Sequence, residues 1–354
     1  MVSATASLNP PKRVFIFSPL IDIVVLGGMS ILFFAIFQAM DLMSPYMRMN
    51  ESGAQALMWL NWIVNQPHYS ATYYRVYRSW SETKRYEIVS MWLPLVLLGI
   101  TVWCFLAPHS VAPWFCKAYF ISVSYHYAGQ SYGIALIFMH KAGIAVNRWI
   151  KVCLGIPIYT SAVLWLIGDE VITQRRYFSG VTLPVAGFPP WTYLLALCLL
   201  IWGVALYVIM SFVLARSNRK IPLVVHIVVL AQLIWFTMAP RLEYFALLVP
   251  FFHCIQYLVI TTYFRLQELV RGGKISQAAS GRFFTSPYFW RYYALLIVVG
   301  LILFNGIPQG LAFLKVSNAD FAYAVIYSFI NLHHFLLDGE IWKLRKPDIG
   351  KALI

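Results

Sequence analysis

Long uninterrupted runs of apolar residues constrain this chain more than any other feature. A helix of about 20 apolar residues crosses the roughly 30 Å hydrocarbon core of a bilayer. Ten blocks of about that length or more lie at 14–40, 54–78, 86–107, 113–139, 148–168, 190–214, 221–239, 242–264, 289–314 and 319–342. With 60% hydrophobic and 11% charged residues, the 354-residue chain is far more apolar than a soluble domain. We therefore predict a single all-α, polytopic membrane domain, 1–354, with about ten transmembrane helices.

The basic residues predict how this bundle is oriented. If the spans alternate from a cytoplasmic N-terminus, six of the 27 Lys and Arg residues fall outside and the other 21 at cytoplasmic ends. This positive-inside pattern places both terminal segments, 1–13 and 343–354, in the cytoplasm. The same alternation makes 169–189 an outer loop and 265–288 a cytoplasmic loop. The compact loops fit an integral protein of a bacterial inner membrane.

Charge and cysteine usage exclude several other classes of protein. The net charge of +14 arises from basic residues at span ends, which favours contact with anionic lipid headgroups over nucleic acid binding. The five cysteines fall in or beside apolar stretches, and none forms a Cys-x-x-Cys. That pattern indicates neither a disulfide framework nor a thiolate zinc site. The expected partners are therefore the lipid bilayer and a lipophilic small molecule.

Histidines inside the predicted spans are the strongest functional signal. Four spans that run in the same direction carry His68, His126, His253 and the pair His333 and His334. Counted from the cytoplasmic end of each span, these residues lie roughly 14 to 20 Å deep at 1.5 Å per residue. A single such histidine is most often a packed, hydrogen-bonded residue, and a proton relay is an alternative reading. Several at one depth predict a metal site, because imidazole suits iron, copper, zinc and nickel.

Four further polar residues lie where they can orient these histidines. Three of them follow a histidine by four residues and so share its helix face: Gln130, Tyr257 and Asp338. The fourth, Asp22, lies at nearly the same depth in the first span. Ligating histidines usually donate their second N–H to an oxygen of this kind. We therefore predict that these four residues support the metal ligands.

The order of the histidine motifs resembles that of the bacterial β-carotene 15,15′-dioxygenase family (the Brp/Blh type). The matching residues are Pro67–His68, His126–Tyr127 followed by Gly129, His253, and His333 with Asp338 five residues later. The resemblance implies a polytopic protein that holds a non-haem iron with histidines. It covers four short stretches of the chain.

Two features of the chain depart from that family. Tyr257 stands where the family has a second histidine in its third motif, and the acidic residues that follow the family's first two histidines are absent. By the resemblance His333 is the ligand, whereas the spacing to Asp338 favours His334. The sequence leaves that choice open.

Three classes of function follow from these observations. The first is a non-haem iron oxygenase that acts on a lipophilic substrate such as a carotenoid, an isoprenoid or a lipid, because an all-histidine site leaves coordination positions open. The second is a haem- or quinone-binding electron-transfer subunit, since histidines at one depth can ligate haem. The third is a transporter or a structural subunit of a membrane complex, although no internal repeat of the transporter kind is visible. We expect the first, with iron favoured over haem or another transition metal.

Overall fold

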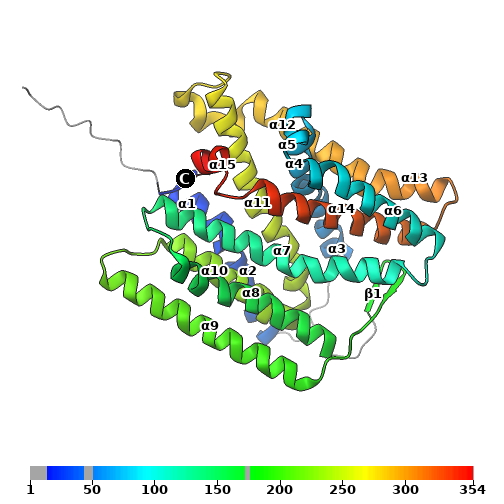
Figure 1. The fold of residues 1–354 in the computed structure, drawn as a ribbon, viewed down its shortest axis with the longest axis horizontal. Coiled ribbons are helices and arrows are strands. Elements are labelled where there is room, and N and C mark those ends of the chain that lie inside the picture. The colour runs from blue at the N-terminus through cyan, green and yellow to red at the C-terminus, as the bar shows by residue number, and fades with distance from the viewer. Residues whose placement is uncertain (1–13, 44–50, 172–175, 354) are drawn as a thin grey trace, which may run out of the picture.

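The computed structural model describes residues 14–43, 51–171 and 176–353, and these form an almost entirely helical protein (Figure 1). In chain order the α-helices are α1 (Pro19–Ile23), α2 (Met29–Met43), α3 (Glu51–Leu60), α4 (Gln66–Tyr77), α5 (Trp80–Arg85), α6 (Leu93–Leu106), α7 (Ala112–Lys141), α8 (Arg148–Val171), α9 (Pro190–Arg216), α10 (Leu223–Thr237), α11 (Glu243–Arg271), α12 (Pro287–Leu301), α13 (Ile307–Phe313), α14 (Ala319–Ile341) and α15 (Pro347–Leu353). Four π-helical turns join some of them into longer rods: η1 (Val24–Gly28), η2 (Asn61–Asn65), η3 (Ile88–Trp92) and η6 (Ile302–Gly306). Short 3₁₀ turns, η4 (Ala239–Arg241) and η5 (Gln277–Thr285), flank α11. The described residues contain one small sheet, in which β1 (Arg176–Phe178) pairs antiparallel with β2 (Val181–Leu183).

Each of the ten predicted apolar blocks coincides with a helical segment. Seven helices in the described part of the chain are long and apolar enough to cross a membrane: Pro19–Leu42, Ile88–Leu106, Arg148–Val171, Pro190–Arg216, Leu223–Arg241, Phe245–Arg271 and Pro287–Phe313. The all-α class is therefore confirmed, and the seven helices indicate an integral membrane protein. The count of ten spans and the cytoplasmic side of both termini stay predictions, and the N-terminal tail 1–13 lies outside the described residues.

The π-helical turns have a local cause in the sequence. In η2, η3 and η6 the second residue after the turn is a proline, namely Pro67, Pro94 and Pro308. A proline inside a helix lacks an N–H and clashes with the carbonyl four residues earlier. A wider turn just before the proline relieves that clash and lets the helix continue. These prolines therefore shape continuous rods rather than end them.

The helices that lie inside the bundle are α4, α7, α11 and α14. Helix α7 contacts α8, α10 and α14, while α4 contacts α11, α12 and α14. Helices α8 and α9 form an adjacent pair at one edge of the bundle (Figure 1). On α9, Leu194 and Ile201 are about 60% exposed, as helices that face lipid require. The interior helices α4, α7 and α14 belong to none of the seven strongly apolar segments, because they carry the polar residues of the site.

Candidate metal centre

Four imidazoles from four different helices meet inside the bundle. His68 lies on α4, His126 on α7, His253 on α11 and His334 on α14, and all four are buried. The ring centroid of His334 lies 4.4 Å from that of His68 and 4.9 Å from that of His126. The centroid of His253 lies 5.2 Å from His68 and 5.0 Å from His126. The structure thus brings four of the five predicted histidines into direct contact.

Most of the ring nitrogens in this group have no hydrogen-bond partner. Among the described residues, Nε2 of His68, Nε2 of His126 and both ring nitrogens of His253 and His334 are buried and unpaired. More than nine in ten buried polar groups in native proteins are paired, and an unpaired one costs about 1–3 kcal/mol. Unpaired nitrogens gathered at a single point are what a bound metal ion satisfies, because each neutral imidazole can offer it a lone pair. The residues therefore fit a metal ion.

The spacing of the donor atoms fits a single ion. One donor atom each from His68, His126, His334 and Asp338 lies within 4.8 Å of the other three. Ligands about 2.1 Å from a metal lie at most about 4.2 Å from one another. Small inward shifts of the side chains therefore suffice to complete a coordination shell. Histidines with one carboxylate are a ligand set that zinc and non-haem iron accept.

Asp338 is held so that one of its oxygens faces the histidines. Its Oδ1 accepts hydrogen bonds from Thr72 Oγ1 at 2.8 Å and from the Tyr257 hydroxyl at 2.7 Å. Its Oδ2 lies 3.4 Å from Nε2 of His334, which is within ion-pair distance but without hydrogen-bond alignment. The indole of Trp342 donates to the Tyr257 hydroxyl at 3.0 Å. Oδ2 is thereby left to bind a metal or to orient His334.

The two members of the His333–His334 pair have different surroundings. His334 belongs to the imidazole group, whereas Nε2 of His333 lies 3.0 Å from the carbonyl oxygen of Val89 and 3.3 Å from the Tyr77 hydroxyl. Since neighbouring residues on a helix are about 100° apart, they cannot face the same point. The structure therefore places His334 in the imidazole group and His333 against η3.

Three of the predicted supporting residues have partners other than the expected ones. The Gln130 amide donates to the carbonyl oxygen of His253 at 2.8 Å, not to the ring of His126. Tyr257 bonds to Asp338 and not to His253. Asp22 accepts hydrogen bonds from the backbone N–H groups of residues 16 and 17 at the start of α1. Among the four, only Asp338 faces the histidine that its spacing predicted.

Sequence reasoning missed several residues that contact the imidazoles or Asp338. Thr72 follows His68 by four residues, so the spacing rule that picked out Asp338 also points to it. Cys254 follows His253 in the sequence, and its Sγ lies 3.3 Å from Nδ1 of His68. The rings of Tyr127 and Phe335 stack on His253 and His126, with centroids 3.8 and 4.3 Å apart. Each of these aromatic residues adjoins a site histidine in the sequence, and that adjacency was the available signal.

A cavity of about 620 Å³ reaches the imidazole group from one side. His126 and Asp338 contribute to its wall, together with Tyr257 and Phe335. The remaining wall is largely apolar and aromatic and comes from α7, α8, α11 and α14. Small-molecule sites occupy about 300–1,000 Å³ and are lined mainly by such residues. The cavity is therefore of the right size and character to hold a ligand beside the metal centre.

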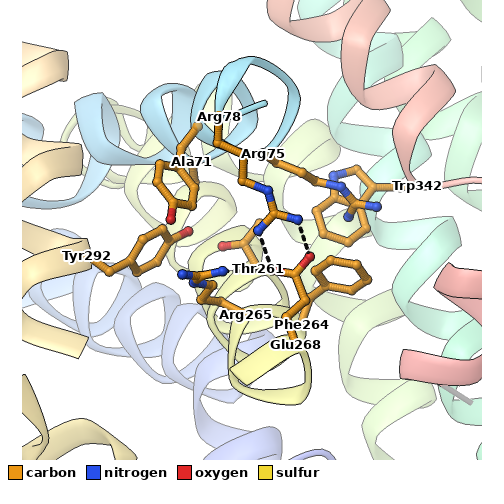
Figure 2. Close-up of a pocket in the computed structure, with 10 residues that line it drawn as sticks. Ala71, Arg75, Arg78, Thr261, Phe264, Arg265, Glu268, Tyr292 and Trp342 are labelled. Carbon is orange, nitrogen blue, oxygen red and sulfur yellow. Dashed lines mark hydrogen bonds and ion pairs between the residues drawn. The ribbon is translucent and has the colours of Figure 1, made fainter. Parts of the chain in front are cut away.

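The buried Arg75 packs against Trp342, which is one of the residues in the wall of this cavity. Figure 2 shows the Arg75 guanidinium beside the rings of Phe264 and Trp342, whose centroids lie 4.0 and 4.1 Å from its central carbon. Nearby, Arg78 forms a two-pronged ion pair with Glu268 at 2.6 and 2.5 Å. Trp342 is thus fixed on its ring face by Arg75 and at its N–H by the hydroxyl that bonds Asp338. This packing holds Trp342 in place, and through it the Tyr257 hydroxyl that bonds Asp338.

Comparison with known proteins does not identify the function of this chain, so the function is inferred from the geometry of the site. No protein-family model matches the chain, and no curated protein or solved structure shows significant similarity to it. The established features are an all-helical chain with seven helices able to span a membrane and a buried group of histidines with one aspartate that can hold a metal ion.

Proposed function

We propose that this chain is a membrane metalloprotein that holds one transition-metal ion, non-haem iron, inside its helical bundle. His68, His126 and His334 are the assigned ligands, with Asp338 as the carboxylate and His253 beside them. The observation that carries the proposal is the set of buried, unpaired ring nitrogens in mutual contact. A metal ion that binds these nitrogens removes the cost of leaving them unpaired.

We infer that the metal centre serves an oxygenase reaction on a lipophilic substrate, such as a carotenoid, an isoprenoid or a lipid. The 620 Å³ cavity supports this inference, because it adjoins His126 and Asp338 and its wall is largely apolar. Non-haem iron with open coordination positions supplies the chemistry of O₂ activation. The protein's part is to hold the substrate's chain against Phe335 and to keep water from the centre. The sequence resemblance to the bacterial β-carotene dioxygenase family points the same way.

A haem site fits the same residues less well. The ring centroids of His253 and His334 each lie 4.4 to 5.2 Å from those of His68 and His126, and the centroids of His68 and His126 lie 6.3 Å apart. Two axial histidines of a haem approach the iron from opposite faces of a porphyrin. Rings in mutual contact leave no room for that macrocycle between them. A bare ion is therefore the better occupant.

The test is metal analysis with an absorption spectrum on the purified full-length protein. We expect about one iron per chain and no Soret band, with the iron lost in His68→Ala, His126→Ala and His334→Ala. Two matched controls should keep it: His333→Ala, one residue away but facing η3, and His226→Ala, whose Nδ1 bonds the Tyr207 hydroxyl at 2.7 Å. A metal-free wild type, or iron retained in all three site variants, would overturn the proposal.

The oxygenase step has its own test. Iron-loaded protein is incubated under O₂ with β-carotene, a linear isoprenoid alcohol or a fatty acid, and O₂ uptake and substrate loss are followed together. We expect uptake that matches the loss of one of these substrates and that disappears in His334→Ala. Iron-loaded protein that consumes O₂ with none of the three would refute the oxygenase assignment and leave the metal site standing.

A further inference from the structure

We propose that the cavity beside the metal centre takes a single-chain amphiphile with an anionic headgroup, a carboxylate or a phosphate. The headgroup lies at the basic end of the cavity, and the hydrocarbon chain runs inward toward His126. The inference rests on the proposed function, because it names the substrate class of the same site.

Charge is distributed unevenly along the cavity wall. Three basic residues contribute to it at one end: Lys151 near the start of α8, and Lys343 and Arg345 just beyond α14. The one carboxylate in the wall, Asp338, is buried and already accepts two hydrogen bonds. Lys343 pairs with Glu340, whereas among the described residues neither Lys151 nor Arg345 makes an ion pair. The basic end therefore carries positive charge that the wall itself does not neutralise.

The basic end and the metal centre are separated along the helix axis. Ile341, the last residue of α14, follows His334 by seven residues, or about 10 Å at 1.5 Å per residue, and Lys343 lies two residues further along the chain. Leu136 and Ile260 also line the cavity, and both are apolar. The cavity therefore has a basic end, an apolar passage and the metal centre at its other end. This arrangement suits an extended amphiphile whose headgroup lies at the basic end.

Glycines on two facing helices make the room for this passage. Gly129 and Gly133, one turn apart on α7, and Gly339 on α14 all contribute to the wall. A Cβ added to Gly133 or Gly339 would meet no atom within 4 Å, and one on Gly129 would meet only the Tyr159 hydroxyl, at 3.8 Å. The space is therefore open at each of these positions, and a larger side chain at any of them would project into it.

A headgroup with negative charge complements this cavity better than a neutral molecule does. Hydrogen bonds from Lys or Arg to a carboxylate or phosphate are about twice as strong as neutral ones. The three cations lie at helix ends that the charge pattern places at the cytoplasmic membrane surface, where basic residues attract anionic groups. An anionic amphiphile lying in the membrane can reach this end without leaving the lipid–water boundary.

The first test compares two probes with the same chain, palmitate and hexadecanol, binding to the full-length protein in amphipol. We expect the double variant K151Q/R345Q to bind palmitate about tenfold more weakly and hexadecanol unchanged. The control R219Q/K220Q removes two exposed cations from the end of α9, outside the cavity wall, and should bind both probes like the wild type. Equal affinity of the wild type for the two probes, or equal palmitate loss in both double variants, would overturn the proposal.

The second test fills the passage. Gly133→Leu should abolish binding of both probes, while Gly99→Leu should leave it unchanged, because a Cβ at Gly99 also meets nothing within 4 Å but lies on α6 outside the cavity wall. Palmitate binding that survives Gly133→Leu, or palmitate displaced by an equal concentration of phosphatidylglycerol, would rule out a single-chain ligand in this cavity.

Iron measured in the same samples separates this inference from the proposed function. An iron-loaded wild type that binds palmitate and hexadecanol alike contradicts the amphiphile and leaves the metal centre standing. A wild type that holds palmitate tightly through Lys151 and Arg345 but contains no iron supports the amphiphile and contradicts the metalloprotein.

Discussion

Replacing Asp338 by asparagine should weaken metal binding and leave the fold intact. Asparagine has the same shape and keeps an acceptor for the Thr72 and Tyr257 hydroxyls, which lie 2.8 and 2.7 Å from Oδ1. It presents an NH₂ group, however, to Nε2 of His334, which lies 3.4 Å from Oδ2. That donor makes Nε2 an acceptor and puts the ring proton on Nδ1. The imidazole then has no free lone pair to offer a metal.

The size of the effect follows from the role of the carboxylate. Removing a group that orients a metal-bound histidine typically costs 10- to 100-fold in metal affinity. This corresponds to about 1.4 to 2.8 kcal/mol at 25 °C. Because both hydroxyl bonds are kept, the free energy of unfolding of the metal-free protein should change by less than about 1 kcal/mol. Anaerobic equilibrium dialysis of Fe²⁺ against a competing chelator measures the first quantity, and thermal unfolding measures the second.

The matched control is Asp320→Asn, the same substitution on the same helix. Asp320 is exposed in the first turn of α14, 18 residues from Asp338, or about 27 Å along the helix axis. Its variant should bind Fe²⁺ like the wild type. If the two variants bind Fe²⁺ equally tightly and unfold at the same temperature, Asp338 has no part in holding the metal.

Three further predictions concern acid, packing and a buried ion pair. Iron retained after dialysis should fall as the pH is lowered from neutral, because a ligating imidazole must be unprotonated and acid returns its proton; equal retention at every pH at which the protein stays folded would count against histidine ligands. Gly300→Ala should destabilise the protein by about 1–3 kcal/mol, since the added Cβ would lie 2.8 Å from the Cβ of Gln66. The control Gly310→Ala should not destabilise it, because a Cβ there would meet no atom within 4 Å, and equal melting temperatures of the two variants would refute the close contact at Gly300. Lys117→Met should cost about 3–5 kcal/mol by leaving the buried Glu170 carboxylate without its ion-pair partner, and adding Glu170→Gln should restore much of the loss in denaturant unfolding.

The sequence could predict that the histidines meet, because the depth of a residue in a membrane helix follows from the number of residues to the helix end. A residue's position along a helix follows from its distance to the helix end, and the four imidazoles that counting placed in one layer do touch. Direction about the helix axis depends on packing instead. His333 and His334 have almost the same depth, and only the contacts of α14 with α4, α6 and α7 decide which one faces inward.

Spacing along one helix predicted which residues share a face of that helix, but it did not predict their hydrogen-bond partners. Gln130 does share a face of α7 with His126, yet its amide bonds the backbone of α11, because that helix packs close by. Asp22 was placed by depth in the first span, but residues 16 and 17 fold back so that their N–H groups reach its carboxylate. These outcomes depend on contacts between distant parts of the chain, which a count of positions within one helix does not contain.

The π-helical turn before Pro67 has a consequence for how the chain can change in length. Such a turn holds one residue more than an α-helical turn, so η2 amounts to a single-residue insertion absorbed without breaking the rod. Deleting one residue from Asn61–Asn65 would turn the π-helical turn into an ordinary α-helical one and leave α3 facing nearly the same way relative to His68. Helices α3 and α4 are thus joined at a turn where the chain can lose one residue without changing which face α3 presents relative to His68.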